Sequence, residues 1–313
     1  GWSPAAHRLL DSLKPFCSQE FQNSPVAEWN PSQRGIYSKK FALKIHKILR
    51  PQLPQEMILP AEKLPRVCSN RPQIENLLRE WGKLMVKAPW SSSGRGLQPV
   101  TKTPVVEKVW DKINGIINDQ GYVMVEPMLD KVMDVALQFE LKSQKVTFLG
   151  VSRFLTDKKG QYQGNFLRNT KENIPPEARH IFHLLPDWAR NSISKAIENS
   201  ILARQYEGFF GIDVLIYRDD AGKIRANPCL EINVRQNMGL LSLHLEKQLS
   251  PRAKGIFKTL YLRDKSFPSF QKEMENKHPL RMEKNKILSG FVALTPMIEK
   301  THFGAYLIAE PYE

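Results

Sequence analysis

The sequence predicts an α+β fold with two mixed lobes, because strand-like and helix-like segments alternate without the regular repeat of a doubly wound parallel sheet. Residues 84–86 form a short apolar run, 105–118 show helical apolar spacing, and 122–125 form a second apolar run. These three segments predict one compact small lobe. Alternating runs at 132–141 and 145–154 predict the first strands of a larger lobe.

The larger lobe continues with segments of both kinds. A polar loop is expected at 156–170, a helix at 187–205, a hairpin at 211–217 and 224–234, helices to about 262, and strands at 287–294 and 305–309. A boundary near Ser69 follows a connector rich in proline. The expected organisation is therefore an N-terminal region at 1–70, a small lobe at 71–130 and a large lobe at 131–313.

Composition narrows the class of protein. The 313 residues are 41% apolar, and no apolar run approaches the about 18 residues that a membrane span needs. Three scattered cysteines indicate neither a disulfide framework nor a zinc cluster, so a cytoplasmic protein is expected. The chain begins with Gly rather than Met, and part of a native N-terminus could precede it.

The net charge of +14 raises the question of nucleic-acid binding. The densest basic excess lies at 251–286, with ten Lys or Arg against four Asp or Glu. No nucleic-acid-binding signature accompanies it, so a solvated basic face is the favoured interpretation. Such a face also suits a protein that collects anionic substrates.

Acidic residues on the predicted hairpin form the first candidate site. If the turn centres on Gly222, Asp213 lies opposite Glu231, and two such carboxylates repel unless a cation lies between them. Strand periodicity then places Asn233 and Arg235 on the face of Glu231. The pattern favours a Mg²⁺ site beside an anion over an ordinary surface hairpin, although a bulge near Pro228 would disturb the register.

Two further motifs are weak when taken alone. Lys87 ends a strand and precedes a loop of small residues, 91–96, whose amides could surround a phosphate; a flexible surface loop is an equally good interpretation. Glu126 and Pro127 interrupt an apolar strand, where unpaired backbone groups could meet an adenine edge. For this second motif alone, a simple strand terminus is the better interpretation.

Together, in this order and at these separations, the motifs resemble the ATP-grasp superfamily over about residues 81–239. The resemblance implies the ATP-grasp fold, with the N-terminal region as a short form of the domain that precedes it. It assigns the phosphates to Lys39, Lys87, Ser91, Ser92, Ser93, Gly94 and Gly96, adenine to Glu126, Met128 and Leu129, and the ribose to Asp134. It assigns the metal to Asp213, Glu231 and Asn233, and the acceptor's carboxylate to Arg235.

The resemblance also implies the reaction. An ATP- and Mg²⁺-dependent ligase, with Mn²⁺ as an alternative metal, would join a small carboxylate to an amine or thiol through an acyl phosphate. Two alternatives remain open at this point: a phosphotransferase without ligation, and a basic binding protein regulated by nucleotide. A homo-oligomer is compatible with the sequence, and a membrane partner is not expected. Trp90 and Arg95 depart from the family, since they stand where small residues are usual.

Overall fold

Two antiparallel sheets form the framework of the protein in a computed structural model that describes residues 4–28, 30–91, 96–157, 161–168, 172–262, 266–299 and 302–312. One sheet has four strands in the order β1-β4-β2-β3, and the other has nine in the order β11-β12-β13-β10-β7-β6-β5-β8-β9. Every pairing between neighbouring named strands is antiparallel. The expected α+β class is confirmed.

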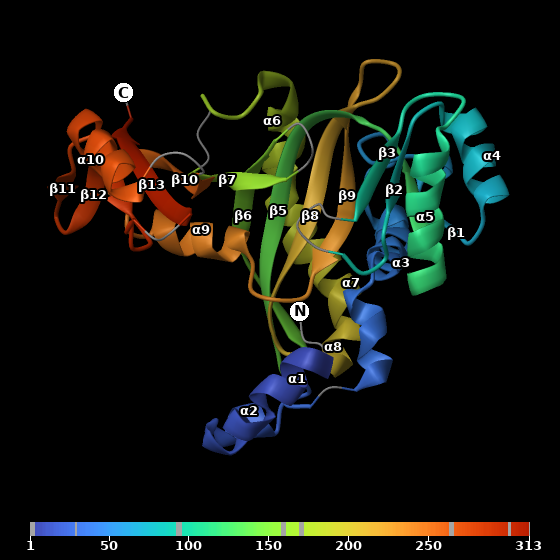
Figure 1. The fold of residues 1–313 in the computed structure, drawn as a ribbon, viewed down its shortest axis with the longest axis horizontal. Helices are drawn as coiled ribbons and strands as arrows, with labels where there is room; N and C mark the ends of the chain where they lie inside the picture. Colours follow the sequence, from blue (N-terminus) through green and yellow to red (C-terminus); the bar gives the residue numbers. More distant parts are fainter. Residues whose placement is uncertain are drawn as a thin grey trace.

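The small lobe is the four-stranded sheet with two helices packed on one face, seen on the right of Figure 1. The buried side chains Ile74, Val86 and Trp110 join the helices to the sheet in a core of their own. The first strand lies before residue 71, where the lobe was expected to begin. The elements are β1 (Arg66–Cys68), α4 (Arg71–Trp81), β2 (Leu84–Lys87), β3 (Leu97–Val100), α5 (Glu107–Gln120) and β4 (Val123–Pro127).

The nine-stranded sheet runs from the centre of Figure 1 to the C-terminal strands on its left. Its long central strands β5 and β8 lie next to the edge strand β9, and the candidate metal site lies on β8 and β9. The strands are β5 (Asp130–Lys142), β6 (Lys145–Thr156), β7 (Tyr162–Leu167), β8 (Gly208–Arg218), β9 (Ile224–Asn233), β10 (Ala253–Tyr261), β11 (Arg281–Glu283), β12 (Lys286–Ala293) and β13 (Phe303–Pro311).

Helices cover one face of the central strands and bury the largest core. Phe210, Ile212 and Val214 point into this core, so strand periodicity places Asp213 on the opposite face. The core therefore fixes the side of the sheet on which the acidic residues lie. The helices are α3 (Lys39–Leu49), η3 (Arg50–Gln52), η5 (Pro176–Ala178), α6 (Arg179–Trp188), the π-helix η6 (Ala189–Ile193), α7 (Ser194–Glu198) and α8 (Leu202–Gln205). Outside this set, η4 (Ala61–Lys63) follows in the connector, and α9 (Met238–Glu246) and α10 (Phe267–Lys277) pack near the C-terminal strands.

Three expectations for the large lobe are wrong in detail. The polar loop at 156–170 contains β7, and the helical stretch to 262 contains β10, which pairs with β7 on one side and β13 on the other. Both errors involve strands whose partners lie far along the chain, so local periodicity carries little of the signal. The single helix at 187–205 is instead a succession of short helices interrupted by a π-helix at Ala189–Ile193.

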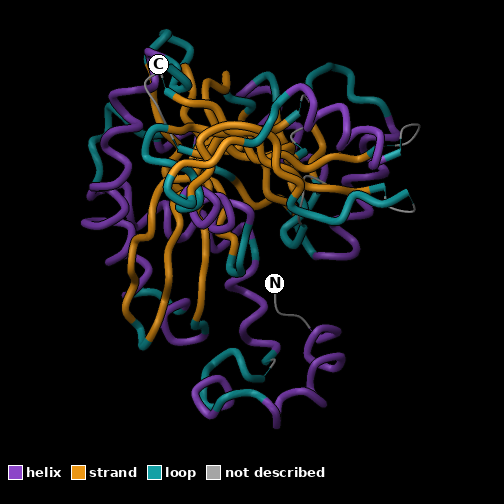
Figure 2. The backbone as a smooth tube through the Cα atoms, turned by 90° about the vertical axis from the view of Figure 1, so that its left-hand side faces the viewer, coloured by secondary structure: helices purple, strands orange, loops and turns teal. Residues whose placement is uncertain are grey.

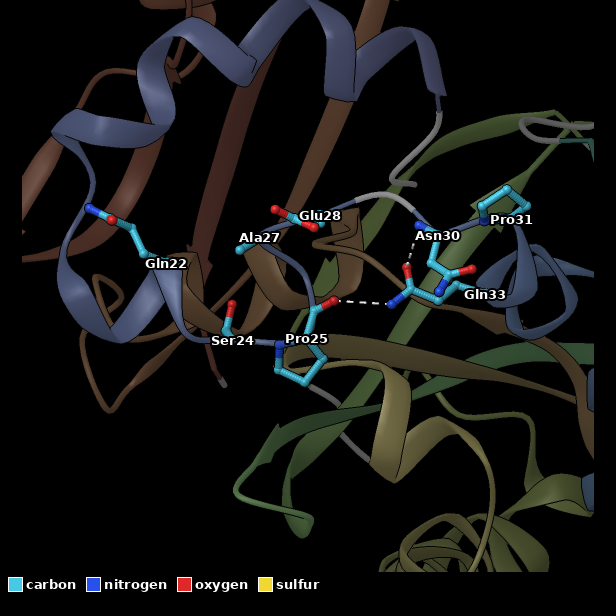
Figure 3. A pocket seen from close by; sticks show the side chains of 8 residues that line it. All are labelled: Gln22, Ser24, Pro25, Ala27, Glu28, Asn30, Pro31 and Gln33. Carbon is cyan, nitrogen blue, oxygen red and sulfur yellow. Dashed lines mark hydrogen bonds between the residues drawn. The ribbon is translucent and has the colours of Figure 1, made fainter.

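The N-terminal segment extends away from the body of the molecule, as Figure 2 shows. Its loop lines an open cleft of about 600 Å³, shown in Figure 3, and the lining residues include Asn30 and Gln33. The Gln33 amide donates to the carbonyl of Pro25 at 3.0 Å and to that of Gln205 on α8 at 3.3 Å. The segment is thereby attached to the large lobe. Its elements are α1 (Pro4–Leu10), η1 (Asp11–Phe16), α2 (Gln19–Gln22) and η2 (Pro31–Tyr37).

Among the described residues, no helix has the length and apolar character needed to cross a bilayer.

Candidate functional site

Asp213 and Glu231 lie directly opposite each other on β8 and β9, as expected from the sequence. The cause differs from the one assumed. Near the turn, Leu215 pairs with Asn227 and Ile216 with Ala226, a register that centres the turn on residue 221 rather than on Gly222. A bulge between Asp213 and Leu215 then shifts the pairing by two residues. The bulge that the sequence suggested near Pro228 is therefore the reason that the two carboxylates face each other.

Burial of the Asp213 carboxyl and, to a smaller extent, the nearby Glu231 carboxylate together raise the pKa of Asp213 to about 8. The amide of Asn233 opposes this shift by donating to Asp213 Oδ2 at 3.0 Å. A divalent cation between the two carboxylates would favour the ionised form of both. The pair therefore fits a hard cation better than it fits two free acids.

Lys39 supplies the positive charge at this pair in the structure. Its Nζ lies 3.1 Å from Glu231 Oε1, 3.1 Å from the carbonyl of Ser91 and 3.2 Å from Ser91 Oγ. Lys39 is the first residue of α3, whose N-terminus is capped by the side chain of Ser38. One buried lysine thus connects the small-lobe loop to the hairpin of the large lobe.

Asn233 and Arg235 continue the same line of contacts. Arg235 Nη2 donates to Asn233 Oδ1 at 3.0 Å, while the amide nitrogen of Asn233 faces Asp213. An Asn233 oxygen turned toward a metal would require rotation of this amide. Within the described part of the chain, no carboxylate forms an ion pair with Arg235, so its guanidinium retains donors for an anion.

Lys87 and Glu126 form a second pair, deeper in the small lobe. Lys87 Nζ lies 2.6 Å from Glu126 Oε2, and each side chain is about nine-tenths buried. The pairing follows from the sheet, because the antiparallel strands β2 and β4 place Glu126 opposite Met85, two residues from Lys87 on the same face. A buried lysine neutralised by a single carboxylate is a cation that a phosphate could recruit.

The adenine assignment rests on backbone groups after β4. The amide of Met128, which the sequence left without a partner, donates to the carbonyl of Lys83 at 3.0 Å. The Met128 side chain is exposed, and Leu129 packs against a small core that includes Leu59 and Met124. Met128 could therefore contact an adenine with its side chain, whereas its backbone amide already has a partner.

The phosphate loop is described only at its two ends. Ser92, Ser93 and Gly94 lie outside the described residues, while Ser91 and Gly96 close the loop. A Cβ added to Gly96 would lie 2.3 Å from Ser91 Oγ and 2.9 Å from the Cβ of Ala88. The carbonyl of Gly96 accepts from the amide of Ala88 at 2.9 Å. Only glycine allows this close approach.

Asp134 lies on the same sheet face as Asp213, because Val135 and Val214 pair between them and both point into the helical core. Its carboxylate accepts from Lys131 Nζ at 2.6 Å and from Thr156 Oγ1 at 3.2 Å. Sequence reasoning did not identify Lys131 or Thr156. The spacing of Lys131 and Asp134 across an irregular part of β5 gave no usable periodic signal.

Trp90 has a local role that the sequence showed only as a departure from the family. Its ring lies under the guanidinium of Arg34 at 4.0 Å, and its Nε1 donates to the carbonyl of Arg34 at 3.0 Å. Its amide donates to Gln120 on α5 at 3.0 Å. Trp90 thus attaches the start of the phosphate loop to the segment that precedes α3.

The metal assignment has two carboxylates and one amide. No group of three or more Asp, Glu, His or Cys that could hold a metal occurs among the described residues. Mg²⁺ is commonly bound by one or two carboxylates together with phosphate oxygens and water. Asp213 and Glu231 therefore fit Mg²⁺ that is carried by a nucleotide better than a site closed by protein ligands alone.

Comparison with known proteins finds similar structures but no match to the sequence. No protein-family model matches the sequence, and curated proteins give no match. Solved structures do match. N5-carboxyaminoimidazole synthetase from Staphylococcus aureus, in complex with ADP, gives a TM-score of 0.54 at 13% identity, over 98% of this chain and 80% of that one. An ADP complex of N5-carboxyaminoimidazole ribonucleotide synthetase gives 0.55 at 10% identity, over 99% and 74%.

A third match is the biotin carboxylase domain of 2-oxoglutarate carboxylase from Hydrogenobacter thermophilus, in complex with MgADP and bicarbonate. It gives a TM-score of 0.50 at 11% identity, over 89% of this chain and 63% of that one. This chain therefore spans less than two-thirds of that structure. Likeness at such low identity concerns the fold, and the fold is that of the ATP-grasp enzymes, as the sequence predicted.

Proposed function

We propose that this ATP-grasp chain is an ATP- and Mg²⁺-dependent ligase that joins a small carboxylate to an amine, releasing ADP and phosphate. The observation that carries the proposal is one continuous line of contacts. It runs from Lys39 through Glu231 to the facing Asp213, and then through Asn233 to Arg235. Cations for phosphate, carboxylates for a metal and a guanidinium for a second anion thus lie along one face.

Each part of this line has a task in phosphoryl transfer. Lys39, Lys87 and the amides of the loop from Ser91 to Gly96 would hold the phosphates, and Asp213 and Glu231 would hold Mg²⁺. Bound Mg²⁺ would neutralise charge that develops on the phosphate oxygens. Asp134 would face the ribose. Glu126, Met128 and Leu129 would border the adenine, with the Glu126 carboxylate also holding Lys87.

Arg235 separates this proposal from simple ATP binding. Its guanidinium would place a carboxylate of the substrate beside the γ-phosphate, since the fork of N–H donors matches two carboxylate oxygens. A carboxylate oxygen then attacks the γ-phosphorus, and the bond to ADP breaks. An amine attacks the carbonyl carbon of the acyl phosphate, loses a proton, and phosphate leaves. This sequence of steps needs no nucleophilic side chain.

The ligands bound in the similar solved structures support the proposal. Two of them hold ADP, and the third holds MgADP with bicarbonate, an acceptor that itself carries a carboxylate-like anion. The basic character of this chain suits anionic substrates. The cytoplasmic location expected from the cysteines is in keeping with such a role.

Hydroxylamine provides the test, because it converts an acyl phosphate into a stable hydroxamate and phosphate. The protein is incubated with Mg-ATP, hydroxylamine and a panel of carboxylic acids, and ADP and hydroxamate are measured. We expect both products in equal amounts, and their loss in Asp213→Asn. ADP with a stable phosphorylated product and no hydroxamate would instead identify a phosphotransferase. No ADP with any acid would overturn the enzymatic proposal.

A further inference from the structure

A cavity of about 360 Å³ lies where β9 ends and the N-terminal segment meets the large lobe. Three separate parts of the chain contribute to it, and Arg235 is one of its lining residues. The N-terminal segment provides Phe21 and Val26, the turn before β8 provides Tyr206 and Glu207, and the end of β9 is followed by Val234, Arg235 and Gln236. The space is open to solvent, and its volume lies at the lower end of the range of small-molecule sites.

The charges of the cavity favour an anion. Arg235 gives one hydrogen bond to Asn233 and forms no ion pair with a carboxylate of the described residues. The opposing charge, Glu207, is engaged elsewhere, since its Oε1 accepts from the amide of Ser143 at 2.9 Å. An anion that enters the cavity therefore meets a guanidinium with spare donors.

Apart from Gln236, the remaining walls are apolar. Phe21 and Val26 are half-buried, Val234 is buried in the main core, and the Tyr206 hydroxyl donates to the carbonyl of Phe209 at 2.7 Å. With its hydroxyl so occupied, Tyr206 offers the cavity the apolar part of its ring. Bicarbonate or acetate would leave these walls uncovered, whereas an aromatic or branched aliphatic group would cover them.

The N-terminal side of the cavity is held in place. Gln33 donates to the carbonyl of Pro25, within the loop that carries Val26 (Figure 3), and also to that of Gln205, one residue before Tyr206. Glu20, beside Phe21, pairs with Lys142 at the end of β5 at 2.7 Å. The apolar wall is thus part of the folded protein rather than a free arm, and it can select a ligand without being ordered first.

From this cavity we infer that the acceptor is a carboxylic acid with an aromatic or branched aliphatic body, and that Phe21 and Val26 determine this specificity. The inference rests on the proposed function, because it gives the carboxylate a position at Arg235. It adds the class of substrate, and it assigns the N-terminal segment to substrate selection.

The test compares 3-phenylpropanoate with acetate and bicarbonate, by calorimetry for binding and by hydroxamate formation for turnover. We expect 3-phenylpropanoate to have a kcat/KM at least about tenfold higher than that of acetate, since filling an apolar pocket typically gains that much. Phe21→Ser should raise its KM about tenfold and leave the KM for acetate and the Mg-ATP thermal shift unchanged. Phe16→Ser is the matched control, because Phe16 is 87% exposed in the same segment and does not line the cavity.

The outcomes separate the inference from the function on which it rests. Equal use of acetate or bicarbonate, or equal behaviour of the Phe21 and Phe16 variants, would overturn the inference and leave the ligase intact. Binding of 3-phenylpropanoate that depends on Phe21 but never produces ADP would support the cavity and overturn the ligase. Absence of binding by calorimetry would overturn the cavity whatever the activity.

Discussion

Lys39 Nζ lies 3.1 Å from Glu231 Oε1, although the two residues are 192 positions apart in the sequence. The lysine side chain is 6% exposed and that of Glu231 28% exposed, so the pair is shielded on one side and open on the other. Asp213 faces Glu231 across the strands, so Lys39 pairs with one member of two facing acids. A metal bound between Asp213 and Glu231 would supply the positive charge that Lys39 supplies when no metal is bound.

Substitution of Lys39 tests this relationship. Lys39→Met should lower the free energy of unfolding by about 2 kcal/mol without metal, because it leaves the facing carboxylates without a cation. Millimolar Mg²⁺ should restore part of the loss in Lys39→Met. Urea denaturation with and without Mg²⁺ measures both effects. An identical loss in both conditions would show that free Mg²⁺, without nucleotide, does not bind at Glu231 and Asp213.

Nucleotide binding is tested at the other lysine. Mg-ATP that binds only the folded protein stabilises it by about 2.7 kcal/mol at a hundredfold excess over Kd. Lys87→Met alone would leave Glu126 buried and uncompensated, so the informative variant is the double change Lys87→Met with Glu126→Gln. This double variant should fold and should lose most of the thermal shift with Mg-ATP. A wild-type shift would remove Lys87 from the phosphate site.

Gly96, at the end of the phosphate loop, can be tested against Gly115, a second glycine of the small lobe. Gly96→Ala would place a Cβ 2.3 Å from Ser91 Oγ, so Ser91 has to move, and with it a partner of Lys39. We expect about a tenfold weaker Mg-ATP affinity and a loss of about 1 kcal/mol in stability. Gly115→Ala, at an exposed position of α5 with no atom within 4 Å of the added Cβ, should keep the affinity and stabilise the protein slightly. Equal affinity in the two variants would argue against a close approach at Gly96.

Stability should depend on pH through His46, which is buried on α3. Desolvation lowers the pKa of His46 to about 4, with the charge of Arg50 acting in the same direction. A lowered pKa in the folded state means that protons bind the unfolded chain first, so this contribution to stability is complete above pH 6.5 and is lost as the pH falls toward 4. The loss over this window should reach about 3 kcal/mol.

His46→Leu should remove that part of the pH profile, measured by urea denaturation at several pH values. His183→Leu, at an exposed position of α6, should keep the wild-type profile. A profile unchanged by His46→Leu would assign the acid sensitivity to other groups.

Local hydrophobic periodicity predicted much of this fold. The elements and contacts that it missed depend on partners far away in the sequence. The strands β2 and β4 and the helix α5 of the small lobe follow from periodicity within about fifty residues of chain, whereas Asp213 and Glu231 face each other because of the bulge in their hairpin. The strand at Ala253–Tyr261 does not, because its partners β7 and β13 lie far away in the sequence. The contact of Lys39 with Glu231 likewise depends on how α3 packs on β9, which neither segment encodes alone.

The bulge near Pro228 shows a second limit of prediction from the sequence. The sequence indicated that a distortion was possible there but not its direction, and the shift by two residues restores the pairing rather than disturbing it. In the same way, residue types in the cavity beside Arg235 could not be grouped from sequence. Phe21 and Tyr206 come together where Gln33 attaches the N-terminal loop to α8 and Glu20 pairs with Lys142.

Arg235 distinguishes a ligase from a protein that only binds nucleotide. Its guanidinium donates to Asn233, and no acid of the described residues forms an ion pair with it, so the role of a structural ion pair has no support there. Arg235→Lys keeps the charge and loses the fork, and it should therefore raise the KM for the acid about tenfold with little change in the affinity for ATP. Arg235→Ala should keep the affinity for ATP and abolish the ADP release that the acid stimulates. Calorimetry with a non-hydrolysable ATP analogue and a coupled assay of ADP release measure the two quantities separately. If Arg235→Ala weakens nucleotide binding as much as the double change at Lys87 and Glu126 does, Arg235 belongs to the nucleotide site and the acceptor's carboxylate lies elsewhere.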